Sequence, residues 1–436
     1  MTVRTACSRG EFLLGGFAFA ALPGWGRPNE KAVGEAFLPW ERADGNATDS
    51  VFCRRAYLDF AGRLPTGPEA REFARSPDRA ALVSRLVDSE DFADYWSMRF
   101  ADLLRIKSEF PINLWPNAVY VYHRRVRDFV RNDEPWNRFA WELINACGSD
   151  FRDAEVNFLR ATADRSAEGL ARTVVKTFLD EDIERWPADE RAAAVKAFAA
   201  VRFKSTREWK EELVYTEGPD RRGEFAQYLL GEARGRFAAA FEGYVNYWIF
   251  GRKRVGTRIP GMLARDCGFS LKGLCRAIAL SPEYARGSVR GGFPLRRLDA
   301  EVLSDALVTL IGFPRDYRSI APEPFTLLPK ARKSVLVEDG SIGSSFLTLF
   351  GRPPRDSGEL TERSNEISAK QRLFLMNSGV IYDRCRRMKG DVPSVYWRFL
   401  GRAPTERELK IVRERKVAVR DLAWCVINSR EFLYRG

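Results

Sequence analysis

The sequence predicts a mainly α protein, built as an array of helix hairpins with little β structure. Apolar residues recur with the 3.6-residue period of a buried helix face, for example over residues 92–104 and 302–310. A phrase that ends one helix and starts the next is written near both ends of the chain. Period-two alternation is scarce, and the best strand candidate is EELVYTE, residues 211–217. Helices therefore dominate the predicted fold.

Length and composition predict two helical domains behind a short leader. The chain has 436 residues, of which 45% are hydrophobic and 12% aromatic, so it can bury a sizeable core. We expect an export signal and linker over residues 1–26, an N-terminal helical domain over 50–216 and a C-terminal helical domain over 223–436.

Residues 1–26 have the layout of an export signal. Arg4 and Arg9 precede the eleven-residue apolar run FLLGGFAFAAL, which is too short to span a bilayer, and the helix-breaking PGWG follows. Gly10 takes the place of the second arginine of a twin-arginine signal, so general secretion is the favoured route; a buried N-terminal helix is the alternative. No other apolar run is long enough to cross a membrane. We expect an exported, periplasmic or cell-envelope protein whose mature form has no transmembrane span.

The phrase AYLDFAGRLPTGPE, residues 56–69, returns as VYWRFLGRAPTERE, residues 395–408. Each copy ends a helix at a glycine, continues through an arginine and restarts a helix with a T-x-x-E capping box. In the two copies these residues are Gly62 and Gly401, Arg63 and Arg402, Thr66 and Thr405, and Glu69 and Glu408. Gly251 and Gly351 stand in shorter echoes of the same corner. The phrase predicts a helix joint.

A second repeated feature is a serine that can cap a short helix. Ser89, Ser281 and Ser429 each follow an apolar helical stretch and precede an aromatic residue by three positions. An acidic residue two positions after each serine suits the positive end of a helix dipole.

These motifs resemble a pair of domains of unknown function, found in exported proteins of planctomycete and verrucomicrobial bacteria and often beside cytochrome c-like modules. The N-terminal member is matched by CRRAYLDFAGRLPTGPE, SEDFADYWSMRFADLLR and NDEPWNRFAWELI. The C-terminal member is matched by FEGYVNYWIFGR, PLRRLDAEVLSDAL, FLTLFGRPPR and the closing NSREFL. The resemblance runs from about residue 52 to the end, and it implies a family without a firmly assigned activity.

One departure from this family bears on cofactors. Relatives continue a TFLG-like segment into a CxxCH element that suits haem or metal ligation, whereas KTFLDEDIERW, residues 176–186, contains no cysteine or histidine. We therefore expect no cofactor and no metal. Six cysteines follow the predicted signal without any CxxC pair, so disulfides and buried free thiols both remain open. His123 is the one histidine of the chain, either a general base or a partly buried helix residue.

The basic charge balance has two interpretations. Lys and Arg number 71 against 59 Asp and Glu, and 57 of the 71 are arginine, whose guanidinium fork fits phosphate or sulfate. Acidic residues are interleaved throughout and no long basic run occurs, which favours arginines scattered over solvated helix faces over a polyanion-binding face; a nucleic-acid partner is not expected.

Candidate site residues come from the motif stretches. Asp59, Asp102 and Asp299 are the candidate catalytic carboxylates, although Asp299 follows two arginines and an ion pair at a helix start would also explain it.

Arg63, Arg352 and Arg402 follow the corner glycines. They are candidates for ligand binding, or for a structural role at the open carbonyls of a helix end. The glycine- and serine-rich DGSIGSS, residues 339–345, is interpreted as a surface loop.

The sequence thus favours an exported envelope protein that binds another envelope protein or an anionic glycan. The alternative is a carboxylate-based hydrolase of polysaccharide, which would need two acids converging in a cleft.

Overall fold

The computed structural model describes residues 45–288, 293–321, 325–326, 328 and 332–435, and the predicted export signal lies outside them. The helices of the first half are α2 (Asp49–Ala56), α3 (Gly67–Arg75), α4 (Arg79–Val87), α5 (Glu90–Leu103), α6 (Pro116–Asn132), α7 (Trp136–Asn145), α8 (Asn157–Arg160), α9 (Ala167–Leu179) and α10 (Ala188–Phe198). They are followed by α11 (Arg222–Leu230), α12 (Arg234–Phe250), α13 (Met262–Asp266), α14 (Leu271–Ala279), α15 (Pro282–Ala285), α16 (Ala300–Ile311) and α17 (Ser345–Leu349). The last are α18 (Ala369–Asn377), α19 (Gly379–Arg386), α20 (Val392–Phe399), α21 (Glu406–Glu414), α22 (Val419–Ile427) and α23 (Arg430–Leu433).

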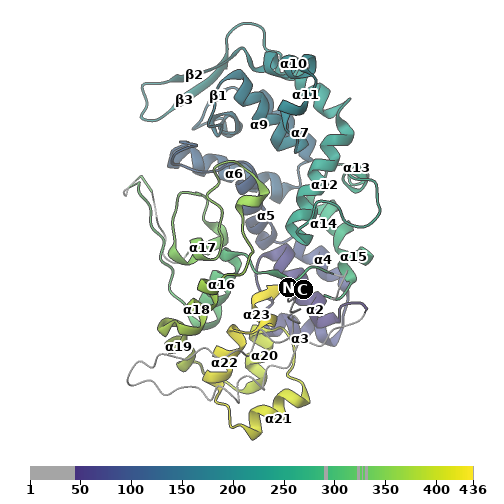
Figure 1. The fold of residues 1–436 in the computed structure, drawn as a ribbon, viewed down its shortest axis with the longest axis vertical. Helices are drawn as coiled ribbons and strands as arrows, with labels where there is room; N and C mark the ends of the chain where they lie inside the picture. The colour runs from purple at the N-terminus through teal and green to yellow at the C-terminus, as the bar shows by residue number, and fades with distance from the viewer. Residues whose placement is uncertain (1–44, 289–292, 322–324, 327, 329–331, 436) are drawn as a thin grey trace, which may run out of the picture.

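The fold is mainly α, as predicted (Figure 1). In the described chain, strands form only a three-stranded sheet, ordered β1 (Gly148–Ser149), β3 (Glu212–Thr216), β2 (Val201–Ser205), and a two-stranded pair of β4 (Arg296–Arg297) with β5 (Tyr434–Arg435). β3 lies within the strand predicted for residues 211–217 and pairs antiparallel with β2, with Val201 opposite Thr216.

The repeated phrase is a helix joint in both copies. α2 continues through a π-helical turn, Tyr57–Ala61, and ends at Gly62, whose φ is 60°. α20 ends just before Gly401, whose φ is 72°. Glycine suits both positions because it enters the left-handed region without a Cβ penalty. The next helices, α3 and α21, start with the predicted capping boxes, in which a threonine hydroxyl and a glutamate carboxylate satisfy backbone N–H groups.

The serine caps also form as predicted. Ser89, Ser281 and Ser429 accept from the backbone N–H three residues on and start α5, α15 and α23, respectively. Each following aromatic residue, Phe92, Tyr284 and Phe432, is buried.

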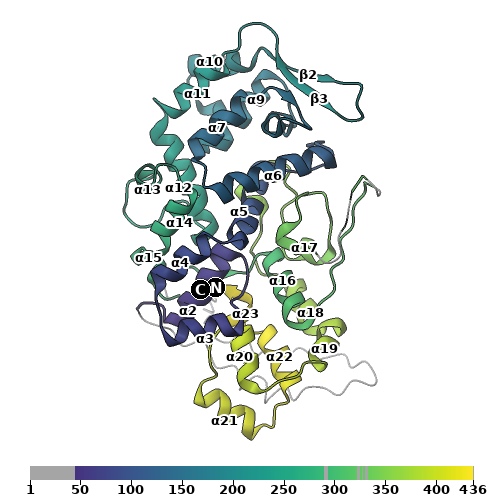
Figure 2. The ribbon, with the colours of Figure 1, turned by 180° about the vertical axis from the view of Figure 1, so that it is seen from behind.

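The three regions that contain the serine caps, around α2–α5, α14–α15 and α20–α23, pack on one another between the middle and the lower end of the molecule as drawn (Figures 1 and 2). α20 packs on α3, and α14 packs on α4. Buried Arg54 on α2 donates to the carbonyls of Phe399 and Phe432 at 2.9 and 2.8 Å, so the first copy of the phrase is tied to the last. One hydrophobic cluster runs from Phe52 to Phe432 through both halves of the chain.

The DGSIGSS segment reaches the surface at Gly343 and Ser345, as expected of a surface loop, but other parts of it are buried. Asp339 is buried, and its carboxylate accepts from the backbone N–H of Ser108 at 3.0 Å. The N–H of Gly340 donates to the carbonyl of Ile106 at 3.0 Å. Long-range hydrogen bonds to residues 106–109 therefore hold this segment in place, although its glycine and serine content is typical of an exposed loop. None of the described helices is both long enough and apolar enough to span a bilayer.

Candidate functional site

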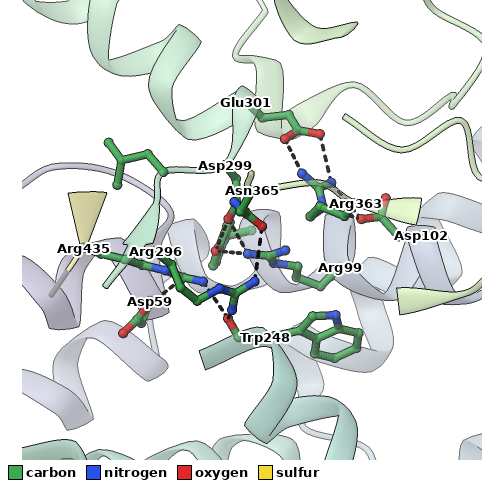
Figure 3. A network of polar contacts seen from close by, with 12 residues as sticks. Asp59, Arg99, Asp102, Trp248, Arg296, Asp299, Glu301, Arg363, Asn365 and Arg435 are labelled. Atoms are coloured by element: carbon green, nitrogen blue, oxygen red, sulfur yellow. Dashed lines mark hydrogen bonds and ion pairs between the residues drawn. The ribbon is translucent and has the colours of Figure 1, made fainter. Parts of the chain in front are cut away.

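The three candidate aspartates lie in one network of polar contacts between α5, α16 and the two ends of the described chain, in which Asp59 and Asp299 are buried and Asp102 is partly buried (Figure 3). Asp299 stands at the N-cap of α16 and pairs with Arg99 of α5. It also accepts from the hydroxyl of Tyr95 at 2.9 Å and from the amide of Asn365 at 3.0 Å. The ion pair at a helix start exists, but its partner is Arg99 and not the preceding Arg296 or Arg297.

Asp102, about one helical turn beyond Arg99 on α5, is held by two arginines. Arg355 donates to it at 2.8 Å and Arg363 at 2.7 Å, and Arg363 also donates to Glu301 at 2.6 Å (Figure 3). Burial acts to raise the pKa of Asp102, but the charges and hydrogen bonds of Arg363 and Arg355 outweigh it and lower the pKa. The pKa of Asp299 is likewise lowered well below its usual value, because Arg99 and the other arginines around it overcome burial.

The pKa of Asp59 is shifted in the opposite direction from those of Asp102 and Asp299. Its carboxylate pairs with Arg435, the penultimate residue of the printed sequence, and accepts from the hydroxyl of Tyr284 at 3.0 Å. Burial dominates here and raises the pKa of Asp59 despite these partners. Arg435 also donates to the carbonyl of Trp248 at 2.7 Å, so it bridges an acid of the first corner to α12.

The space beside this network is too small for a sugar. The cavity lined by Arg99, Asp102, Trp248, Arg296 and Arg363 has a volume of about 10 Å³, roughly that of one water molecule. A general acid needs a raised pKa and access to the glycosidic oxygen. Asp102 and Asp299 have lowered pKa values, and Asp59 is sealed in the core. The described geometry gives the hydrolase hypothesis no support at these three residues.

The corner arginines Arg63 and Arg402 occupy equivalent positions. Arg63 donates to Glu69 at 2.8 and 2.9 Å and to Asp91 at 2.7 Å. Arg402 donates to Glu408 at 2.8 and 2.9 Å and to Glu431 at 2.7 Å. Both guanidinium groups therefore donate mainly to carboxylates, one from the capping box and one from the serine-capped helix. The open carbonyls of a helix end are not the main acceptors of these two arginines.

Arg352, the third corner arginine, takes a different partner set. It donates to the carbonyls of Asp339, at 3.0 Å, and Ile342. Burial lowers the pKa of Arg352 to about 10, reinforced by the neighbouring charge of Arg355. All three predicted binding arginines are thus engaged within the protein.

The single histidine and four of the six thiols are also buried; Cys147 is exposed and Cys267 is partly buried. His123 is buried on α6, and burial, with Arg355 and Arg332 nearby, lowers its pKa to about 3. The six cysteines from Cys53 onward are free thiols. Burial raises the pKa of Cys53 to about 12, which leaves the thiol protonated at neutral pH. In the described residues no cluster of three or more histidine, cysteine, aspartate or glutamate side chains could hold a metal ion.

One further hollow opens on the surface at the end of α7. It has a volume of about 300 Å³ and is lined by Trp141, Glu142, Cys147 and Glu155, among others. Both glutamates accept from Arg125, Glu142 at 2.6 Å, so neither is a free acid. None of the three candidate aspartates lies there.

An aromatic cluster at the surface is the feature that sequence reasoning missed. Trp115, half-buried just before α6, and Trp209, exposed in the turn of the β2–β3 hairpin, meet edge to face with ring centroids 5.0 Å apart. The ring of Phe325 lies 4.6 Å from that of Trp209. The three residues come from distant parts of the chain, so only the fold brings them together. In both views the β2–β3 hairpin projects beside the start of α6 (Figures 1 and 2).

The hairpin that carries Trp209 is rich in cations. The hairpin turn reads KSTREWK, residues 204–210, with three basic residues and one acid. The ammonium of Lys210 lies 4.9 Å from the ring centroid of Trp115, a cation–π contact. Lys204 and Arg207 are exposed and form no ion pair with any residue in the described ranges. We call Trp115, Trp209, Phe325 and these three cations the hairpin surface.

The backbone at Trp115 is unusual. Its φ is 70°, in a region that residues with a Cβ rarely enter. Such strain persists only where the surroundings enforce it, and it gathers at functional sites. The N–H of Trp115 donates to the carbonyl of Ser108 at 3.2 Å, which fixes the loop that presents the indole.

Comparisons with known proteins leave the activity open. The search of the curated proteins and the search of the solved structures gave no match. A family model matches the part of the chain that contains Asp59 and Asp102 but neither Asp299 nor Trp209. Residues 41–207 match the family described as PSCyt2, a protein of unknown function (DUF1549), which confirms for this part of the chain the resemblance noted from the motifs.

Proposed function

We propose that this protein is an exported, non-catalytic binding protein of the cell envelope, and that its ligand is an anionic glycan bound at the hairpin surface. The observation that carries the proposal is the surface pair Trp115 and Trp209, with Lys210 over the Trp115 ring and two further exposed cations in the same hairpin. Aromatic faces give large contact areas at low entropic cost, and sugar rings present C–H groups that pack on them. Lys204, Arg207 and Lys210 would meet sulfate or carboxylate groups.

The enclosed state of the other candidates supports a binding role over catalysis. The three aspartates are sealed in ion pairs, and the three corner arginines already have acceptors within the fold. The three cations of the hairpin turn, by contrast, have no carboxylate partner in the described ranges, so they remain available to a polyanion.

Retention on immobilised heparin, a sulfated polysaccharide, tests the proposal. We expect the chain from residue 27, which keeps every described residue, to be retained at about 50 mM sodium chloride and released as salt rises, because exposed charges are screened. Trp209→Ala should weaken heparin binding about fivefold, the effect of losing about 1 kcal/mol of aromatic contact.

Matched control variants show whether heparin binds at the hairpin surface or elsewhere on the protein. Trp141→Ala removes another partly exposed indole, and Lys196→Ala removes an exposed cation on α10, so both variants should bind heparin as the unaltered chain does. No retention of the unaltered chain at low salt would refute glycan binding. Equal binding by Trp209→Ala and Trp141→Ala would place the glycan elsewhere.

A further inference from the structure

A second surface, on α18 and the start of α19, has a different chemistry. Leu373 and Met376 are 53% and 40% exposed, although both are large and apolar. They lie three residues apart and share one face of α18. Gln371 and Leu375, on the opposite side of the helix, are buried. The apolar stripe therefore points away from the core. Ile367 and Val380, before and after α18, are also exposed.

Basic residues lie close to this stripe in the sequence. Between residues 370 and 389 the chain carries six basic residues and a single acid, Asp383. The six are Lys370, Arg372, Arg384, Arg386, Arg387 and Lys389. In the described part of the chain none of them forms an ion pair, in contrast to Arg363 or Arg402, which are each held by two carboxylates. Unpaired cations gathered in this way create a positive potential that attracts an external anion.

We propose that the surface formed by Ile367, Leu373, Met376 and Val380 and the six cations docks on an anionic lipid bilayer. Helices that lie in a membrane interface combine an apolar stripe, which enters the headgroup boundary, with lysine and arginine that contact lipid phosphates. Here Leu373 and Met376 lie on the exposed side of α18, and the cations lie on both sides of them in sequence.

The combination selects a lipid surface over the glycan. An anionic polysaccharide would pair with the cations, but it offers no apolar layer for Leu373 and Met376. The contact is peripheral, because no described helix can cross a bilayer. α18 and α19 lie in the lower half of Figure 1 and the β2–β3 hairpin lies near its top, so the two surfaces are separate. The docking surface goes beyond the proposed glycan binding and does not depend on it.

Vesicle flotation tests this surface with the chain from residue 27, so that the apolar leader is absent. The probes are vesicles of phosphatidylcholine alone and vesicles with about 30% phosphatidylglycerol. We expect binding to the anionic vesicles only. The double variant Arg386→Gln with Arg387→Gln should weaken it about thirtyfold, the effect expected for two surface cations. Leu373→Gln with Met376→Gln should weaken it about tenfold by removing the apolar contacts.

Controls use equally exposed residues elsewhere. Ile259→Gln with Met262→Gln, at sites 67% and 42% exposed, matches the apolar double variant. Arg75→Gln with Arg413→Gln, at exposed sites, matches the cationic one. Unchanged vesicle binding by both test variants, or equal binding to neutral vesicles, would overturn the proposal. So would a change of oligomeric state in the apolar variant without a change in vesicle binding, because the surface would then join two copies of the chain. Heparin retention of the same variants reports the glycan site independently.

Discussion

Single residues show how this fold uses its arginines. Asp299, Asp102 and Asp59 lie in motif stretches, and each is paired with an arginine distant in sequence, the third with Arg435. A buried ion pair gains little net stability over apolar packing, but removing one partner is costly because the other is left charged in a poorly solvated site. The arginines therefore act as long-range ties between segments.

His123 should make the free energy of unfolding depend on pH. Its pKa is about 3 in the fold, against 6.5 for an ordinary histidine, so between these pH values the unfolded chain binds one more proton. The free energy of unfolding should therefore fall as pH drops below about 6.5, and His123 alone should contribute about 2 kcal/mol of this loss at about pH 5.

Urea unfolding of the unaltered chain and of His123→Gln at pH 7.5 and about pH 5 measures this contribution. The variant should lose about 2 kcal/mol less over the interval. Since the sequence has one histidine, no other imidazole contributes. Equal losses in the two proteins would mean that His123 is protonated within the fold.

The helix corner is the element that the sequence describes best. Its glycine, its capping box and the serine cap that follows are local signals, and all of them form as expected. The partners of Arg63 could not be read as directly. Asp91 lies on α5, and α4 separates α5 from α3 in the sequence. The packing of these helices therefore brings the Asp91 carboxylate to the guanidinium of Arg63. The aspartate two positions after Ser89 was the available signal.

A corner prediction follows from Glu69. Burial raises its pKa, but hydrogen bonds from Arg63 and Thr66 outweigh burial and lower it from 4.5 to about 2. Glu69→Gln should therefore reduce the free energy of unfolding by about 2 kcal/mol at neutral pH, through the loss of charge-assisted hydrogen bonds. Because the folded pKa is depressed, the stabilisation exists above about pH 4.5 and disappears as pH falls towards 2.

Thermal and urea unfolding at several pH values check this prediction. Glu72→Gln, on the same helix but exposed, should leave stability within about 0.5 kcal/mol of the unaltered chain. Glu408→Gln should reproduce the effect at the second corner, where Arg402 also lowers the pKa of its glutamate against the effect of burial. A deficit of Glu69→Gln that persists unchanged at pH 3 would contradict the ion-pair explanation.

At the scale of the whole molecule, the sequence predicts the fold class and the joints but not their assembly. Helical periodicity and capping are local, so α5, α16 and the corners could be read from it. The pairing of Arg54 with the last corner and the meeting of Trp115 with Trp209 depend on tertiary packing, for which a single sequence carries no signal. The surface position expected for the DGSIGSS segment is only partly right for the same reason, since the hydrogen-bond partners of Asp339 and Ser341 lie more than 200 residues away.

Arg435 should be important for stability because it joins segments that are far apart in the sequence. Arg435 is buried and ties Asp59 of the first corner to Trp248 of α12. Arg435→Gln leaves the Asp59 carboxylate uncompensated in the core, so unfolding should require about 3–5 kcal/mol less free energy at neutral pH. Asp59→Asn in the same chain removes that charge and should recover a large part of the loss in a double-mutant cycle. The acid dependence provides a second readout: because burial already raises the pKa of Asp59, its protonation in the folded variant should shrink the deficit as pH falls. A deficit that is independent of pH and additive with Asp59→Asn would instead assign the role of Arg435 to its carbonyl contact with Trp248.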